Sequence, residues 1–311
     1  MCSDGGVAEA ILSPVDEFTR ELVQHGLLVP TGVQGLFGKN GVFEAIIRGI
    51  DALVEDTFSD LHAEVFRFPP VISRALLEQS QYLGAFPQLI GSVHSFTGDD
   101  AAHAAALRSV QDTGDWGSAF TSTDVVLTPA ACYPVYGMSS GTLPEGGRTI
   151  DVASYCFRRE PSPDPARMQS FRMHEIVRLG NAESCVAFRD DALDRGVSML
   201  GRMELDAERV AANDPFFGRR GRLLAATQRE QSLKFELVVP ITSTERPTAL
   251  ASANWHQDHF GDLFGIHQAN GERAHTACVG FGLERTALAL LRTHGADVRS
   301  WPRAVRGLLH V

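Results

Sequence analysis

The chain of 311 residues is 44% hydrophobic and 21% charged, with a formal net charge of −10 at pH 7, which excludes a mainly disordered chain and allows a large buried core. The negative charge argues against a surface that coats nucleic acid, because phosphate contacts need many lysines and arginines on one face. No apolar run approaches the roughly 18 residues of a membrane span, and the first residues lack a signal peptide, so we expect a cytoplasmic protein with no membrane partner.

The first part of the chain alternates between predicted helices and extended segments. Apolar residues recur at helical spacing over residues 41–64, and residues 65–73 indicate an extended segment that Pro69 and Pro70 interrupt. A serine N-cap begins a helix at residue 73. Residues 94–110 contain a loop and then another helix.

The middle of the chain is predicted to be mainly extended. Three such segments cover residues 124–136, 148–160 and 170–179. Helical spacing returns over residues 183–232, and two further strands follow over residues 233–241 and 248–255. The last element is a strand that leads into a helix ending at Gly295. This mainly antiparallel α+β pattern has no internal repeat and no linker, so we expect one domain over residues 1–311.

Three short motifs are weak matches to known sites. TGVQGLFGKNG resembles a phosphate-binding loop, but its first glycine is one residue too far from the lysine and Asn40 replaces the required serine or threonine. GFGLER has Arg285 where a dinucleotide-binding motif has its third glycine. HQDH spaces its histidines i,i+3, unlike the i,i+4 pair of HExxH metallohydrolases, so a zinc hydrolase is a minor alternative.

Several charged residues are predicted at positions where their charge is unfavourable unless a ligand of opposite charge binds nearby. Strand alternation places Glu175 among apolar side chains, where it needs a metal, a proton or a cation such as a nearby arginine. The same alternation puts Arg158 and Glu160 on one face of the preceding strand. Arg285 lies in the first turn of its helix, where the helix dipole disfavours a cation unless an anion binds nearby. A solvated surface arginine is the alternative at that position.

Taken together, these features resemble the three motifs of class II aminoacyl-tRNA synthetases, in the same order. The motifs are the long helix with its PP strand, the hairpin FRRE to FRMHE of residues 157–175, and GFGLERT of residues 280–286. SRALLEQSQYLGAFPQL and FRMHEI further resemble the seryl branch. The chain is most similar to the amino acid:[carrier protein] ligases, through PAACYPVY, CFRREPS, QSFRMHE, DPFFGR, LKFEL and NGERAHTACVGFG. This similarity extends from about residue 30 to the C-terminus.

The resemblance implies a fold and a set of ATP contacts. The fold would be α+β, with a six- to seven-stranded antiparallel sheet flanked by helices, a helical insertion at about 181–232, and a homodimer formed through motif 1. Arg158 and Arg285 would be catalytic, with Arg158 on the α-phosphate of ATP and Arg285 over the adenine and the phosphates. The other implied ATP contacts are Glu160, Arg167, Met168, Lys234, Ala249, Leu250, Ala251 and Ser252.

The five cysteines, which are odd in number and scattered, suit free thiols or metal ligands better than a disulfide framework. The resemblance identifies Cys132, Glu175 and Cys278 as zinc ligands, and Glu175 also as a contact of the substrate amino acid. Two thiolates and one carboxylate would leave an open position on the zinc. His174 and His275 are the natural substitutes if one ligand is wrong.

The resemblance further implies a zinc-dependent, AMP-forming ligase. It would activate glycine or alanine with ATP and Mg²⁺ to an aminoacyl adenylate, and would then load the phosphopantetheine thiol of a carrier protein. Arg219, Arg220 and Arg222 in the insertion would meet an acidic carrier. The chain begins close to motif 1, without the helical arm with which seryl enzymes bind tRNA, so no tRNA is expected.

Two alternative functions and two departures from the family pattern accompany this prediction. A minimal seryl-type synthetase would charge tRNA, and a non-catalytic paralogue should have lost Arg158 and Arg285, which are both present. Ile176 stands where the seryl pattern has an adenine-stacking aromatic residue. DHFGDLFG stands where that pattern has DFQxRR, so substrate choice is expected to differ.

Overall fold

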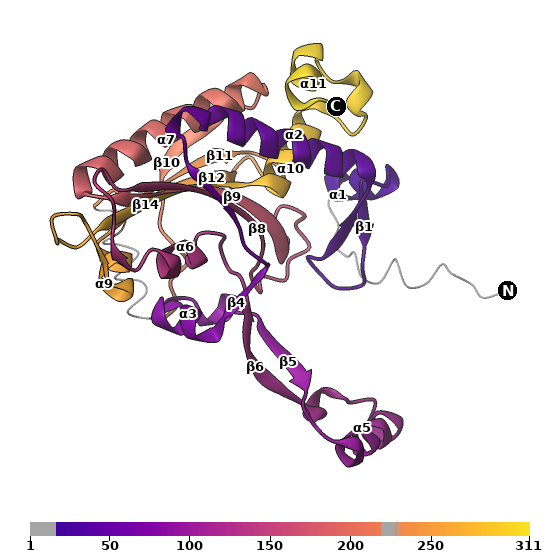
Figure 1. The fold of residues 1–311 in the computed structure, drawn as a ribbon. Coiled ribbons are helices and arrows are strands. Elements are labelled where there is room, and N and C mark those ends of the chain that lie inside the picture. Colours follow the sequence, from indigo (N-terminus) through magenta and orange to yellow (C-terminus); the bar gives the residue numbers. More distant parts are fainter. Residues whose placement is uncertain (1–16, 219–227, 229–230) are drawn as a thin grey trace.

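A seven-stranded sheet forms the centre of the protein in the computed structural model, which describes residues 17–218, 228 and 231–311 (Figure 1). In spatial order its strands are β10 (Glu208–Ala211), β11 (Lys234–Val239), β12 (Thr248–Gln257), β14 (His275–Gly282), β9 (Ser170–Gly180), β8 (Arg148–Phe157) and β3 (Glu64–Arg67). The first six are antiparallel, whereas β3 pairs with β8 in parallel. The α+β class and the size of the predicted sheet are therefore confirmed, and the parallel edge pair is new.

Helices α2, α7 and α10 cover one face of this sheet (Figure 1). They span α2 (Gly41–Thr57), α7 (Ala182–Arg202) and α10 (Leu283–His294), and α1 (Glu17–Gln24) and α11 (Arg303–Leu309) complete this layer. Asn40 caps α2, because its side-chain oxygen accepts hydrogen bonds from the backbone N–H groups of Val42 and Phe43 at 3.1 and 3.0 Å. The apolar stripe of α2 is buried as predicted, but the helix ends at Thr57 instead of residue 64.

The opposite face is covered by three short helices, α3 (Arg74–Gln79), α6 (Tyr133–Met138) and α9 (His259–Phe264). The predicted serine cap is present, since Ser73 Oγ accepts from the Leu76 N–H at 3.1 Å. The prediction of an extended segment over residues 124–136 is wrong beyond Leu127, because α6 begins at Tyr133. Pro134 lies in the first turn of α6, where proline fits a helix because its missing N–H would have no partner there.

Residues 92–127 form an arm that projects from the body (Figure 1). It consists of β5 (Ser92–Phe96), α5 (Asp100–Thr113) and β6 (Phe120–Leu127), and β4 (Val71–Ser73) joins its base. The remaining elements are β1 (Leu28–Pro30), β2 (Phe37–Lys39), α4 (Tyr82–Ala85), β7 (Gly141–Thr142), β13 (Ile266–His267) and the 3₁₀ turns Ser59–Leu61, Pro87–Leu89, Gly117–Ala119 and Val298–Ser300.

The segment predicted as a helical insertion, 181–232, contains one long helix and then an edge strand. Helix α7 packs on the central sheet, and β10 extends that sheet by pairing with β11. Helical spacing alone missed β10 because the strand has only four residues. Arg219, Arg220 and Arg222, the predicted contact for a carrier protein, lie outside the described residues. No helix in the described ranges is both long and apolar enough to cross a membrane.

Candidate active site and metal centre

Three buried side chains meet on the face of the sheet that α6 and α9 cover. Cys132 lies at the start of α6, Glu175 in β9, and Cys278 in the adjacent strand β14. Their ligand atoms all lie within 4.8 Å of one another, and the residues are only 6%, 1% and 4% exposed. The structure thus brings together the three residues identified as metal ligands, although more than a hundred positions separate the first from the last.

Glu175 accepts a hydrogen bond from the backbone, and a glycine on the neighbouring strand leaves space for its side chain. Its Oε1 accepts a hydrogen bond from the Ala131 N–H at 2.7 Å. Gly280 lies directly opposite on β14, and a Cβ there would meet Glu175 Cγ at 3.1 Å. Burial, followed by the charge of Cys278, raises the pKa of Glu175 to about 7. An ion pair with arginine, the alternative prediction, is not found among residues 17–218 and 231–311.

The two thiols are electrostatically unequal. Cys132 acts as a hydrogen-bond donor toward Cys278, which raises the pKa of Cys132 and lowers that of Cys278 well below the ordinary cysteine value. Two sulfur ligands and one carboxylate oxygen, clustered and buried, are a donor set that fits Zn²⁺ with one coordination position left open. The buried Glu175 carboxyl would then have the positive partner that the described residues do not supply.

Arg158 and Arg285 approach each other from the two remaining motifs. Arg158 Nε donates to the Pro129 carbonyl at 2.9 Å, and its guanidinium lies over the Phe171 ring, 5.6 Å from the centroid. Arg285, in the first turn of α10 as predicted, donates to the carbonyls of Ala166 and Ala249 at 2.8 and 3.1 Å. Burial, followed by the charge of Arg158, lowers the pKa of Arg285. Two cations near enough for one to lower the pKa of the other favour the binding of an anion beside them.

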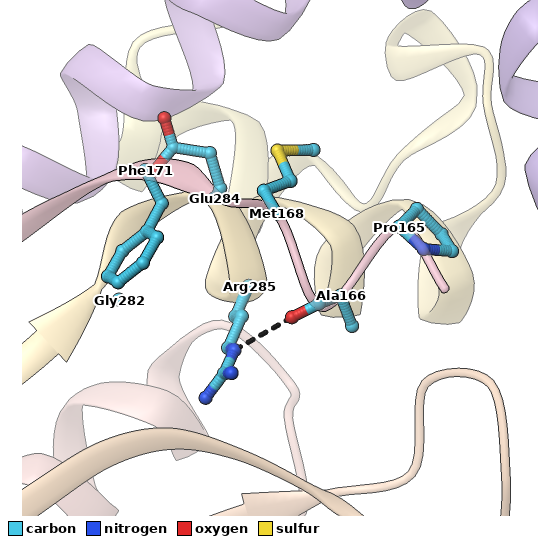
Figure 2. A pocket seen from close by; sticks show the side chains of 7 residues that line it. All are labelled: Pro165, Ala166, Met168, Phe171, Gly282, Glu284 and Arg285. Carbon is cyan, nitrogen blue, oxygen red and sulfur yellow. Dashed lines mark hydrogen bonds between the residues drawn. The ribbon is translucent and has the colours of Figure 1, made fainter. Parts of the chain in front are cut away.

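A small cavity lies beside Arg285 (Figure 2). Its lining consists of Pro165, Ala166, Met168, Phe171, Gly282, Glu284 and Arg285. Figure 2 shows the Arg285 side chain extending to the Ala166 carbonyl, so the loop before β9 and the start of α10 are joined across the cavity. Two of the predicted ATP contacts, Met168 and Arg285, therefore lie together.

Ile176, which stands at the adenine-stacking position of the seryl pattern, lies in the core. It is fully buried in the core beneath α2, α7 and α10, and it is not part of the cavity lining. The reason is strand alternation, because Ile176 and Glu175 point to opposite faces of β9. Phe171 supplies an aromatic ring to the lining of the cavity.

The other predicted ATP contacts lie around the same face. Strand β8 ends at Phe157, so Arg158 and Glu160 follow the strand. The prediction that strand alternation puts them on one face is therefore wrong. Arg167 is an exposed residue of the following loop. Residues 249–252 lie in β12, where Ser252 pairs across the strands with Glu236 on one side and Gly280 on the other.

Lys234 is buried at the start of β11 and is paired with two carboxylates. Its Nζ lies 2.5 Å from Asp214 and 3.3 Å from Glu236. Burial alone would lower the pKa of Lys234, but the charges of Asp214 and Glu236 outweigh it and raise the pKa. Asp214 belongs to DPFFGR, one of the stretches that resemble the family. No role was predicted for the Asp214 carboxylate. The sequence contains no signal that pairs it with Lys234.

His174 and His275, the predicted substitutes, are not in the metal cluster. His174 is hydrogen-bonded to Asp51 and Asp151, and His275 stacks on Trp255. His256, from the HQDH motif, does approach the cluster, since its Nε2 lies 3.6 Å from Cys278 Sγ. Asn254 Nδ2 also lies 3.6 Å from that sulfur, and sequence reasoning missed both contacts.

The fold is that of the class II aminoacyl-tRNA synthetases. The chain superposes with a TM-score of 0.81 over 94% of its length on seryl-tRNA synthetase of M. kandleri in complex with A. aeolicus tRNASec, covering 60% of that chain at 21% identity. It matches seryl-tRNA synthetase from Pyrococcus horikoshii complexed with ATP with a TM-score of 0.66 over 97% of its length, covering 61% of that chain at 14% identity. No protein-family model matches the sequence.

Within this class, the closer curated relatives define the family. The chain is 46% identical over 280 residues to amino acid–[acyl-carrier-protein] ligase 2 of Bradyrhizobium diazoefficiens, covering 89% of this chain and 84% of the relative. Ligase 1 of the same organism is 43% identical over 304 residues, covering 97% and 91%. The chain therefore belongs to the amino acid–[acyl-carrier-protein] ligases and is a ligase.

Proposed function

We propose that this ligase uses ATP and Mg²⁺ to convert a small amino acid, glycine or alanine, into an aminoacyl adenylate at a zinc centre, and then transfers the aminoacyl group to a carrier protein. The observation that carries the proposal is the buried cluster of Cys132, Glu175 and Cys278. Met173, two residues before Glu175 on the same face of β9, has its sulfur 3.9 Å from Arg158 Nη2. Glu175, a proposed metal ligand, and Arg158, the proposed phosphate-binding residue, are therefore neighbours.

The three ligand residues support an amino-acid site. When bound, zinc would supply a Lewis-acid position for the neutral α-amine of the substrate. Tyr136 is buried beside Cys132, and Met173 and Gly280 border Glu175. A substrate held there by its backbone would have little space for a long side chain, which is consistent with glycine or alanine.

The arginines support the activation step. A carboxylate is a poor electrophile, so its oxygen must attack the α-phosphorus of ATP and release pyrophosphate. Negative charge then grows on the phosphate oxygens. Arg158 and Arg285 are half-buried and fixed by carbonyl hydrogen bonds, so they can stabilise this charge without reorganising. Glu160 and Lys234 are further residues that we propose contact ATP.

The choice of acceptor rests on the relatives. The two Bradyrhizobium relatives named above are amino acid–[acyl-carrier-protein] ligases. The type-2 serine–tRNA ligase of Methanopyrus kandleri is 28% identical over 58% of this chain and 37% of its own length. We therefore infer a carrier thiol as the acceptor, with tRNA as the alternative.

A homodimer is the proposed assembly. Strand β3 is the last strand at one side of the central sheet. It pairs with β8 along one edge, and among the described residues no strand pairs with its other edge. Val65 on this strand is 64% exposed. An exposed edge strand with an apolar side chain favours pairing with another chain, and a second copy would protect it.

Two measurements test the proposal. Pyrophosphate exchange should occur with glycine or alanine and should not be detected with large amino acids, and the activated group should then be transferred to a phosphopantetheinylated carrier protein. Exchange with none of the twenty amino acids would refute amino-acid activation. Transfer to tRNA instead of the carrier would identify the alternative function.

The zinc centre requires its own test. Purified protein should contain about one zinc per chain, and Cys132→Ala and Cys278→Ala should lose both the metal and the exchange activity. Cys185→Ala is the matched control, because Cys185 is equally buried but lies in α7, away from the cluster. Full zinc retention in both ligand variants would contradict the assignment.

A further inference from the structure

An irregularity in β12 brings His256 to the metal cluster. The pairing of β12 with β14 shifts register between Trp255 and Gln257, and Gln257 has a φ of 55°, which is strained for a non-glycine residue. Bulges of this kind redirect a side chain and are common next to functional sites. Here the redirected side chain is His256, and its ring faces Cys278 on the neighbouring strand.

The imidazole of His256 makes polar contacts through both ring nitrogens and packs against two aromatic rings. Its Nε2 lies 3.6 Å from Cys278 Sγ, and its Nδ1 lies 3.0 Å from Thr276 Oγ1. The ring also makes edge contacts with Phe260 and Tyr136, with centroid distances of 5.0 and 6.0 Å. Tyr136 and Phe260 are themselves stacked 3.9 Å apart, so the aromatic wall that orients His256 is rigid.

The hydrogen-bonding capacity of each group assigns the donors. A metal-bound thiolate can only accept, so the proton between His256 and Cys278 must be on Nε2. With its proton on Nε2, the ring can accept at Nδ1 from the Thr276 hydroxyl. Asn254 Nδ2, also 3.6 Å from Cys278 Sγ, is a second donor to the same sulfur. Cys278 therefore receives two N–H groups, whereas no such donor reaches Cys132 within the described part of the chain.

We infer that His256 is a positioning residue for the metal centre. It donates a hydrogen bond to Cys278 Sγ, holds that sulfur in its ligating orientation, and stays outside the coordination sphere so that the substrate can occupy the open position. Partners of metal ligands that act in this way typically change metal affinity by about 10- to 100-fold when removed. The inference rests on the proposed zinc centre.

Chelator competition on the full-length protein tests the inference through zinc affinity. His256→Phe keeps an aromatic ring against Tyr136 and Phe260 but removes the donor, so zinc should bind about 10- to 100-fold more weakly. His256→Gln, whose amide can still donate, should recover part of this loss. His259→Phe, the same change at an exposed histidine three residues later, is the matched control and should bind zinc like the wild type.

Cobalt substitution adds a readout that altered packing would not change. Loss of the hydrogen bond makes Cys278 more electron-rich, so the thiolate-to-cobalt charge-transfer band of His256→Phe should move to longer wavelength. An unchanged affinity and band would overturn the inference, as would X-ray absorption showing a histidine nitrogen bound to zinc in the wild type and absent from His256→Phe. A wild-type protein that binds no zinc would refute the metal centre itself.

Discussion

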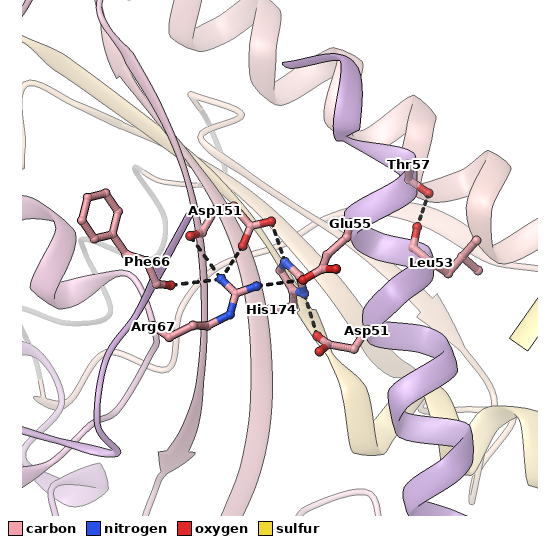
Figure 3. A network of polar contacts seen from close by, with 8 residues as sticks. All are labelled: Asp51, Leu53, Glu55, Thr57, Phe66, Arg67, Asp151 and His174. Carbon is pink, nitrogen blue, oxygen red and sulfur yellow. Dashed lines mark hydrogen bonds and ion pairs between the residues drawn. The ribbon is translucent and has the colours of Figure 1, made fainter. Parts of the chain in front are cut away.

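The most quantitative prediction concerns His174, which is fully buried between two acidic residues (Figure 3). Its Nδ1 lies 2.7 Å from Asp51 of α2, and its Nε2 lies 3.0 Å from Asp151 of β8. Arg67 of β3 joins the same network, because it pairs with Asp151 at 2.6 Å and with Glu55 at 2.9 Å. Histidine with a carboxylate on each nitrogen is most stable when protonated.

The size and sign of the effect follow from the pKa of His174. Burial lowers this pKa, but the hydrogen bonds and charges of Asp151 and Asp51 together outweigh burial and raise it to about 9, against an ordinary value of 6.5. The folded state therefore binds a proton that the unfolded state releases between these values. The resulting stabilisation, about 3 kcal/mol, is complete below pH 6.5 and is lost as the pH rises through about 9.

Urea unfolding followed by circular dichroism, at several pH values between 6.5 and 9.5, would measure this contribution. His174→Gln should be less stable than the wild type at pH 6.5, and the gap between the two proteins should narrow by about 3 kcal/mol by pH 9.5. Comparing the two proteins at each pH cancels the titration of other groups. His94→Gln, an exposed histidine on the arm, is the control and should follow the wild-type profile.

The reasoning is refuted if the gap between His174→Gln and the wild type stays constant across this pH range. A constant gap would mean that the histidine is neutral in the folded protein and contributes through packing alone. Direct titration of the imidazole signal that disappears in His174→Gln gives an independent value, which should lie near 9.

The remaining predictions concern catalysis and packing. Arg158→Ala and Arg285→Ala should each reduce pyrophosphate exchange by about 10²- to 10³-fold while leaving the zinc content unchanged, and loss of zinc in either variant would point to a folding defect instead. Gly49→Ala should lower the free energy of unfolding by about 1–3 kcal/mol in urea, because its Cβ would lie 2.3 Å from the Leu309 carbonyl oxygen. Gly84→Ala, which meets nothing within 4 Å, should be nearly neutral.

Local sequence patterns predicted the elements that bury one regular face. The apolar stripe of α2, the strands β8 and β9, and the strand-to-helix segment ending at Gly295 all lie where their spacing placed them. Shorter elements were missed because four to six residues contain too few repeats to show a period. Strand β10 and helix α6 are the examples, and both needed tertiary pairing to be recognised.

The candidate site depended on a different kind of information. Strand alternation alone predicted a buried carboxylate at Glu175. It could not predict the partners of Glu175, because Cys132 and Cys278 are far from it in the sequence. The family resemblance supplied them. Asp214 and His256 were not assigned roles, since one acts through a pairing with Lys234 and the other through a strand irregularity that leaves no periodic signal.

Strand β9 connects the chemistry of the site to the stability of the fold. Glu175 faces the metal cluster, whereas Arg172 and His174 face α2. Arg172 pairs with Glu44 at 2.7 and 2.8 Å and with Glu284 at 2.9 Å, and Glu284 directly precedes Arg285. These ion pairs therefore fix the start of α10 at the cavity.

A shift of β9 by one residue would exchange its two faces, so that His174 would enter the metal cluster and Glu175 would meet the carboxylates of Asp51 and Asp151. Both outcomes are electrostatically unfavourable, because the proposed metal centre would lose its carboxylate ligand and three carboxyl groups would be crowded together. The charged residues on both faces of β9 therefore favour the register that is observed between β9 and its neighbouring strands. Substitutions on the α2 side should thus alter stability, and substitutions on the cluster side should alter metal binding, although the residues concerned are adjacent in sequence.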